Sequence, residues 1–270
     1  MTVMSLRWLR FGVIAGLAGC ASGSGRSPGP GGEDPLHNSG SRRAAAGGDT
    51  SHFATIYTRM GLAASGAPLL FVGDAGYFAT RSPDTTLVVV SVSLPNRGLV
   101  FTRDQGGYSA SYGVDLSIAN GTGTIAQAHD SEAVRVTTFR ETSRTDESVI
   151  YRRGFRVPPG SYSLSLMVRD DNGQRVSERH LALSVPRLGS ASVSSIEPVY
   201  EANPRTQLDS TPVYLPAPRA SYVFGVDDSA SVYMESYDQG KPISMEVRTP
   251  AGDIAWQGTR RLTARGPGLA

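Results

Sequence analysis

An alternation of apolar and small or polar residues runs through the middle of the chain and restricts it to a β fold. In "YSASYGVDLSI" every even-numbered residue from Tyr108 to Ile118 is apolar. Side chains of a strand point alternately to opposite faces, so this period of two predicts a strand with one face in a core. The same interpretation applies to "TLVVVSVSL", "VRVTTF", "SVIYRRGF", "SYSLSLMVRD" and "RVSERHLALSV". No long amphipathic helix interrupts these segments, which predicts an all-β, antiparallel sandwich.

Two turn signals refine this prediction. Pro158, Pro159 and Gly160 predict a turn, and Tyr162 then opens a strand as a tyrosine corner does in immunoglobulin-like sandwiches. Asn172-Gly173 predicts a two-residue hairpin, because both positions tolerate positive φ. We therefore expect immunoglobulin-like topology, while a chain with a single cysteine cannot form the Cys-Trp-Cys core of an antibody domain.

The chain divides into four predicted regions: a leader (1–19), a tether (20–50), a first sandwich (51–188) and a second sandwich (189–270). The second has about five strand-like segments, which is about two fewer than a complete sandwich of this kind. Either it is truncated or a partner completes its open edge. The segment "HFATIYTRMGL" fits a helical stripe, and a short strand fits almost as well.

Cys20 is the only cysteine, and it follows the layout of a secretory signal. Arg7 and Arg10 precede an uncharged run over 11–18. A helix of about ten residues reaches only ~15 Å, so this run is too short to span a bilayer. Leu17-Ala18-Gly19-Cys20 resembles a bacterial lipobox, where a diacylglyceryl group joins the cysteine sulfur and the peptide is cut before it. Cleavage near Ala18 or Ala21 by an ordinary signal peptidase, leaving a free thiol, is the alternative.

Composition supports a tethered, exported body. Residues 21–49 are mostly Gly, Ser, Pro, Arg and Ala, which cannot offset their conformational entropy by burial. Two of the 26 basic residues lie in the leader, so the remaining chain is nearly neutral. This argues against a nucleic-acid partner, which would require a basic face. Acyl chains such as palmitate on Cys20 would anchor the protein to a membrane, and the absence of aspartate after Cys20 favours the outer membrane.

Several segments together resemble the N-terminal β-sandwich portion of bacterial GWxTD-domain lipoproteins. They are "SVSLPNRGLVFTRD", "VRVTTFRETSRTDESVIY", "VPPGSYSLSLMVRD" and "PRASYVFGVDDSASVYMESYD". The resemblance covers roughly 53–258, but the Gly-Trp-x-Thr-Asp segment is absent, since Trp256 lies in "AWQGTR". It implies export, lipid anchoring and a β fold, and it implies no established activity.

Candidate catalytic and metal-binding residues are sparse. The four histidines, His37, His52, His129 and His180, have no spacing typical of a joint metal site. Two acidic groups could offer oxygens to calcium, although turn formation explains both: Asp170-Asp171-Asn172 and Asp227-Asp228. The loop "ETSRTDES" gathers Glu141, Arg144, Asp146 and Glu147. Loop-fixing salt bridges are expected there rather than acid/base catalysis, so we expect no enzyme activity, no metal and no cofactor.

Tyrosines near the C-terminus are the remaining candidate for binding. Tyr214, Tyr222, Phe224, Tyr233 and Tyr237 alternate with prolines and small residues. They can form a surface platform for a glycan or peptide, or they can fill the second core.

The sequence therefore favours a lipid-anchored cell-envelope protein that acts as a non-catalytic binding or assembly module. Two alternatives remain. One is the accessory part of an envelope enzyme system whose active domain is absent, and the other is a carbohydrate-binding module.

Overall fold

Antiparallel strands make up most of the residues that the structure describes, which confirms the predicted all-β sandwich. The computed structural model describes residues 4–7, 48–144, 148–218, 229–238, 241–262 and 269. Within these residues the helical elements are short: α1 (Gly48–Arg59), η1 (Asn96–Gly98) and α2 (Phe139–Thr142). None of the described helices is long and apolar enough to cross a membrane.

Two facing sheets form the predicted sandwich. The central sheet has the order β2-β3-β4-β8, with β2 (Ala63–Ser65), β3 (Phe71–Ala79), β4 (Thr86–Pro95) and β8 (Ser148–Val157). The large sheet has the order β10-β9-β6-β5, with β7 also paired to β6. Its strands are β5 (Thr102–Asp104), β6 (Gly107–Asn120), β7 (Gly123–Val136), β9 (Gly160–Asp170) and β10 (Arg175–Val185).

One apolar core joins these two sheets. The alternating residues of β6 that the sequence assigns to a core are buried in it, except Tyr108 at the start of the strand. They meet Val88, Val90, Val92 and Leu94 of β4 across the sandwich.

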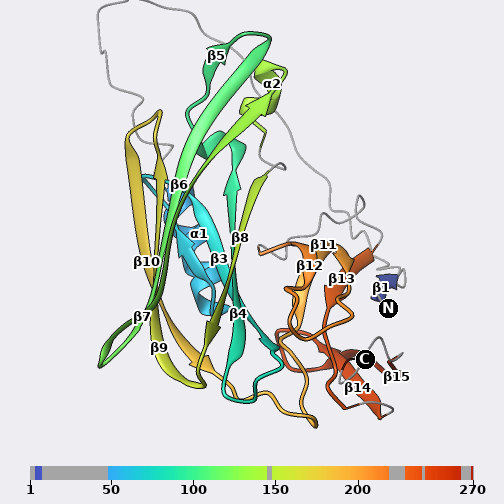
Figure 1. Cartoon of the computed structure of the whole chain (residues 1–270). Coiled ribbons are helices and arrows are strands. Elements are labelled where there is room, and N and C mark those ends of the chain that lie inside the picture. The colour runs from blue at the N-terminus through green and yellow to red at the C-terminus, as the bar shows by residue number, and fades with distance from the viewer. Residues whose placement is uncertain are drawn as a thin grey trace, which may run out of the picture.

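A third layer packs on the outer face of the central sheet, on its side away from the large sheet (Figure 1). This C-terminal sheet has the order β1-β13-β11-β12, with β1 (Met4–Arg7), β11 (Glu197–Asn203), β12 (Val213–Pro216) and β13 (Ser229–Tyr233). Phe78, Leu87 and Val89 of the central sheet share a second core with residues of β11, β12 and β13. All ten residues of β4 are buried.

This layering changes the expected picture of two separate sandwich modules. Among the described residues after 188, the C-terminal sheet shares its core with the first sandwich rather than enclosing one of its own. The remaining hairpin, β14 (Pro242–Arg248) and β15 (Ile254–Arg261), forms a two-stranded sheet. The described part thus contains the five expected strands, arranged as a layer and a hairpin.

Local differences from the sequence predictions have simple causes. Helix α1 begins at Gly48, inside the predicted tether, and ends at Arg59. The segment "HFATIYTRMGL", for which the sequence allowed either a helix or a strand, is therefore mainly helical. The strand expected in "VRVTTF" ends at Val136, because Phe139 begins α2.

The hairpin between β9 and β10 is present, but its turn differs from the prediction. Asp170 pairs with Arg175, which leaves a four-residue loop in place of a two-residue turn. The residue with positive φ is Gln174 (53°), not Asn172 or Gly173. The buried carboxylate of Asp170 accepts a hydrogen bond from the Gly173 N–H (3.2 Å) and fixes this wider loop.

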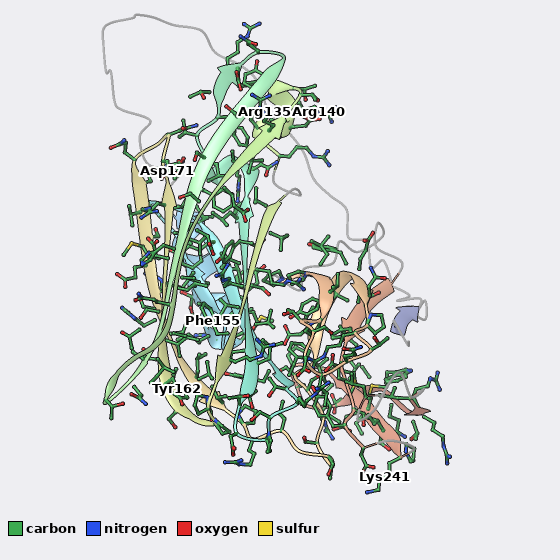
Figure 2. All side chains as sticks on the ribbon, in the orientation of Figure 1. Arg135, Arg140, Phe155, Tyr162, Asp171 and Lys241 are labelled. Atoms are coloured by element: carbon green, nitrogen blue, oxygen red, sulfur yellow. The ribbon has the colours of Figure 1, made fainter. Side chains whose placement is uncertain are left out.

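The hydroxyl of Tyr162 donates a hydrogen bond to the carbonyl of Pro158 (2.9 Å), as expected of a tyrosine corner. Figure 2 shows Tyr162 and Asp171 toward opposite ends of the β9–β10 hairpin. Strand β9, which runs between them, therefore has a side-chain hydrogen bond to the backbone at its beginning and a side-chain-stabilised turn at its end.

Candidate functional site

Polar residues lie between the central sheet and the C-terminal sheet, where the two sheets form the second core. Asp74 pairs with Ser91 and Ser91 with Arg152 in the strand register, so these three side chains form one row on the face toward the C-terminal sheet. Glu197 of β11 reaches this face from the other layer. Its carboxyl carbon lies 2.6 Å from the position that a Cβ would take at Gly76. The absence of a side chain at Gly76 thus makes room for the carboxylate.

The carboxylates of Glu197 and Asp74 are close enough to influence each other. Burial, and next the negative charge of Asp74, raise the pKa of Glu197 to about 8. Burial likewise raises the pKa of Asp74, although a hydrogen bond from the Ala75 N–H (2.7 Å) opposes this shift. Glu197 is 4% exposed, and no other described residue donates a hydrogen bond to its carboxylate or forms an ion pair with it.

Two hydroxyl groups complete this site. Ser91 Oγ and Tyr214 Oη are buried without a hydrogen-bond partner. Burial first, and then the charge of Glu197, raise the pKa of the Tyr214 hydroxyl. We call Asp74, Ser91, Glu197 and Tyr214 the inter-sheet polar cluster.

Arg152 lies beside this cluster but is engaged elsewhere. Its Nη1 donates to the carbonyls of Pro212 (2.7 Å) and Tyr214 (3.0 Å). Its guanidinium carbon lies 5.0 Å from the centre of the Tyr214 ring, a cation–π arrangement that holds the ring in place. Arg152 thus positions Tyr214, and among the described ion pairs it neutralises neither carboxylate.

A second buried network joins the end of β3 to the C-terminal segment. The Arg205 guanidinium and the Glu235 carboxylate meet through two 2.8 Å hydrogen bonds. Arg205 also donates to the carbonyls of Ala79, Leu208 and Ser210. The hydroxyls of Tyr233 and Tyr237 both donate to Glu235. With both partners so fully hydrogen-bonded, we interpret this Arg205 network as structural.

The structure places three of the five aromatic candidates in the interior, so these three follow the second alternative, that of core residues. Tyr214, Tyr233 and Tyr237 are each 6% exposed or less. Tyr214 and Tyr233 stack with ring centres 5.3 Å apart, so they fill the second core. Tyr222 and Phe224 lie outside the described residues, as does Cys20.

Sequence reasoning missed Glu235, which accepts hydrogen bonds from the hydroxyls of Tyr233 and Tyr237. Tyr233, Glu235 and Tyr237 stand at alternate positions in "SVYMESYD". A carboxylate on the same face as two tyrosines is a signal for a buried charge, since such groups are paired when they are buried.

The acidic candidates for calcium are engaged in the β9–β10 turn. Asp170 binds Arg175 and the Val100 N–H (3.2 Å). Asp171 accepts a hydrogen bond from Ser111 (3.1 Å), and Asn172 donates to the Val100 carbonyl (2.9 Å). Asp227 and Asp228 lie outside the described residues. The described ranges contain no group of three or more His, Cys, Asp or Glu side chains arranged for a metal ion.

The "ETSRTDES" loop begins with a helix cap. The Glu141 carboxylate accepts hydrogen bonds from the N–H groups of Thr137 (2.8 Å) and Thr138 (3.0 Å), and these bonds lower its pKa. Asp146 and Glu147 are outside the described residues. A joint acid/base role for this loop stays untested, and Glu141 is explained by capping.

Two of the four histidines have described side-chain partners. His129 Nδ1 lies 2.8 Å from Asp115 Oδ1, and Arg169 contacts the other oxygen of the same carboxylate (2.9 Å). His180 lies 3.6 Å from Glu178. Both histidines are exposed on the outer side of the large sheet, as a solvent-facing strand position predicts.

Comparison with known proteins adds no relative: no family model, no curated protein sequence and no solved structure matches this chain.

Proposed function

We propose that this chain is an exported, lipid-anchored protein of the bacterial cell envelope, attached to the outer membrane through Cys20. Cleavage before Cys20 would remove Met4–Arg7, the edge strand β1 of the C-terminal sheet, and leave its strands β13, β11 and β12. The observation that carries this proposal is the sequence Leu17-Ala18-Gly19-Cys20 after a basic and then uncharged N-terminus. Two or more acyl chains hold a protein on a bilayer, whereas one chain binds only marginally. The resemblance to GWxTD-domain lipoproteins supports the same reading, and the Tyr162–Pro158 hydrogen bond supports an immunoglobulin-like topology.

We further propose that the β body is a non-catalytic module that binds another envelope protein. Exposed apolar residues on the outer face of the C-terminal sheet support this role: Tyr200, Val213 and Leu215. The register places Leu215 opposite Glu201 and Val213 opposite Asn203. An apolar centre with polar neighbours is typical of protein interfaces, and a body tethered to a membrane meets mainly other envelope proteins. The buried positions of Tyr214, Tyr233 and Tyr237 leave these three side chains no free surface for a carbohydrate, which favours the protein-binding role over that alternative.

The anchor is tested with Cys20→Ser in the full-length chain, and Ser22→Ala serves as a control that leaves the cysteine in place. We expect the wild type and the control to incorporate labelled palmitate and to sediment with membranes. The Cys20→Ser variant should lose the label. Equal labelling of all three proteins would contradict lipid attachment at Cys20.

The binding role is tested by photo-cross-linking from position 215 in intact envelopes. A photoreactive residue at exposed Val176 of β10 is the control, because it lies on the large sheet. We expect one discrete adduct from position 215 that disappears when Val213 is changed to Ser. Identical adduct patterns from both positions would argue against this face as a specific interface.

A further inference from the structure

Two of the three buried acidic side chains among the described residues pair with an arginine, and the third does not. The buried carboxylates are those of Asp170, Glu197 and Glu235 among the described residues. Asp170 binds Arg175, and Glu235 binds Arg205. Glu197 has no such partner in the described part of the chain. The charged group that influences its pKa is a second carboxylate, that of Asp74. Two charged carboxylates buried side by side are costly, so either a proton or a cation must neutralise this pair.

The hydroxyls of the cluster point to the same conclusion independently. Ser91 is 1% exposed and Tyr214 is 5% exposed, and neither hydroxyl oxygen has a hydrogen-bond partner. Ser91 is the direct cross-strand neighbour of Asp74. Such neighbours have Cβ atoms about 4.5–5.5 Å apart. Buried polar atoms are almost always satisfied by protein, water or an ion.

We propose that the inter-sheet polar cluster binds a calcium ion, with the carboxylates of Asp74 and Glu197 as charged ligands and the hydroxyls of Ser91 and Tyr214 as neutral ones. Two carboxylates carry the two negative charges that a divalent cation neutralises. With both carboxylates bidentate, the four side chains offer up to about six oxygens, the lower end of the number that Ca²⁺ takes. An all-oxygen set disfavours zinc, and Mg²⁺ prefers to keep several of its waters.

Among the described residues, no cationic side chain forms an ion pair with either carboxylate of the cluster. Arg152 holds the carbonyls of Pro212 and Tyr214 with its Nη1 and covers the Tyr214 ring. Gly76 leaves space for the Glu197 carboxylate against β3. Since three acidic or histidine ligands are not grouped in the described residues, the site depends on its neutral oxygens to complete the coordination.

A calcium ion at this position would join two layers of the fold. Asp74 and Ser91 belong to the central sheet, whereas Glu197 and Tyr214 belong to the C-terminal sheet. A ligand that binds only the folded state stabilises it according to its concentration relative to its Kd. Calcium should therefore strengthen the attachment of the C-terminal sheet, the layer that carries the proposed interface.

The test measures calcium binding to the full-length protein in detergent at pH 7.5, after removal of metals with a chelator. We expect one Ca²⁺ per chain in equilibrium dialysis, with a Kd in the range of about 10⁻⁴–10⁻³ M that is typical of extracellular modules. Added calcium should raise the melting temperature with the same concentration dependence, and Mg²⁺ should do so less.

Variants assign the ligands. Glu197→Gln and Asp74→Asn are nearly isosteric, and each should weaken binding more than about tenfold because a ligand charge is lost. Tyr214→Phe keeps the ring that packs in the core and should also weaken binding. Glu246→Gln, which changes an exposed carboxylate on β14, is the matched control and should bind as the wild type does.

The result that overturns the proposal is the absence of saturable calcium binding up to about ten times that Kd range. Binding that persists unchanged in Glu197→Gln also overturns it. A melting temperature that is unaffected by calcium, but is raised by Glu197→Gln, would show that a shared proton satisfies the two carboxylates instead.

Discussion

Arg205 and Glu235 form an ion pair that is almost completely removed from water, with side chains 1% and 4% exposed. The guanidinium donates to five acceptors, and the carboxylate accepts from two tyrosines as well as from the arginine. Because Arg205 also bonds the Ala79 carbonyl at the end of β3, this pair ties the C-terminal segment to the central sheet.

Glu235→Gln should therefore destabilise the protein strongly. It leaves the Arg205 charge buried without a counter-charge, a change that costs about 3–5 kcal/mol. Chemical denaturation of the purified chain measures this difference. Glu246→Gln removes the exposed partner of Arg248 and should change the free energy of unfolding by less than about 1 kcal/mol. Equal effects of the two variants would contradict the structural role of the buried pair.

Gly76 is required because the Glu197 carboxylate occupies the space of its missing side chain. Gly76→Ala should cost about 1–3 kcal/mol by overpacking. Gly189→Ala, where a Cβ would meet nothing within 4 Å, is the control and should leave stability nearly unchanged. Shortening the acid in the double variant Gly76→Ala, Glu197→Asp should recover part of the loss. Without such recovery in denaturation curves, the clash is not between these two residues.

The β9–β10 hairpin owes its shape to Asp170 rather than to the Asn-Gly pair in its loop. Gln174 is the residue in the left-handed region, so Gln174→Gly should relieve strain and stabilise the protein by up to about 1 kcal/mol. A Cβ at Gly173 would overlap the Asp170 carboxylate and lie 2.8 Å from Cγ2 of Val100. Gly173→Ala should consequently destabilise. Thermal melting of both variants checks this, and the reverse order of stability would contradict this turn.

The strands of the two facing sheets show which parts of the fold the local sequence can predict. The period of two located β6, β9 and β10, since each presents one face to the first core. It could not reveal that β4 is covered on both faces. Ser91 stands at a position typical of a solvent face, yet it is buried, on the face of β4 that shares a core with the C-terminal sheet.

The candidate site was hidden from the sequence for a related reason. Asp74 and Glu197 are more than one hundred positions apart, and each lies at a polar position of its own strand. Only the stacking of the third layer brings the two carboxylates together. For Tyr233 and Tyr237 the sequence left a surface platform and a core position open, and only the structure shows that both are buried.

Because the three stacked sheets share two cores, we expect the described body to unfold as one cooperative structure rather than as two modules joined by a linker. Phe78, Leu87 and Val89 face the C-terminal sheet from strands whose opposite faces fill the first core. Separation of the C-terminal sheet would expose these residues to water, at a cost of about 25 cal/mol per Å² of apolar surface. The β14–β15 hairpin has no such support among the described residues, and a two-stranded sheet is marginally stable alone.

Hydrogen exchange of the whole protein should therefore show two classes of strand. Amides of β14 and β15 should exchange first through local opening, whereas those of β11 and β12 should be protected together with β4. Phe78→Ala should cost about 3–5 kcal/mol and reduce protection in both β4 and β11, because its ring contacts Tyr214 and Tyr233 across the layers. Phe139→Ala, which changes an exposed ring, should leave this pattern intact. If Phe78→Ala released β11 while β4 kept its full protection, the C-terminal sheet would be a separate folding unit, and the cooperative three-layer body would be wrong.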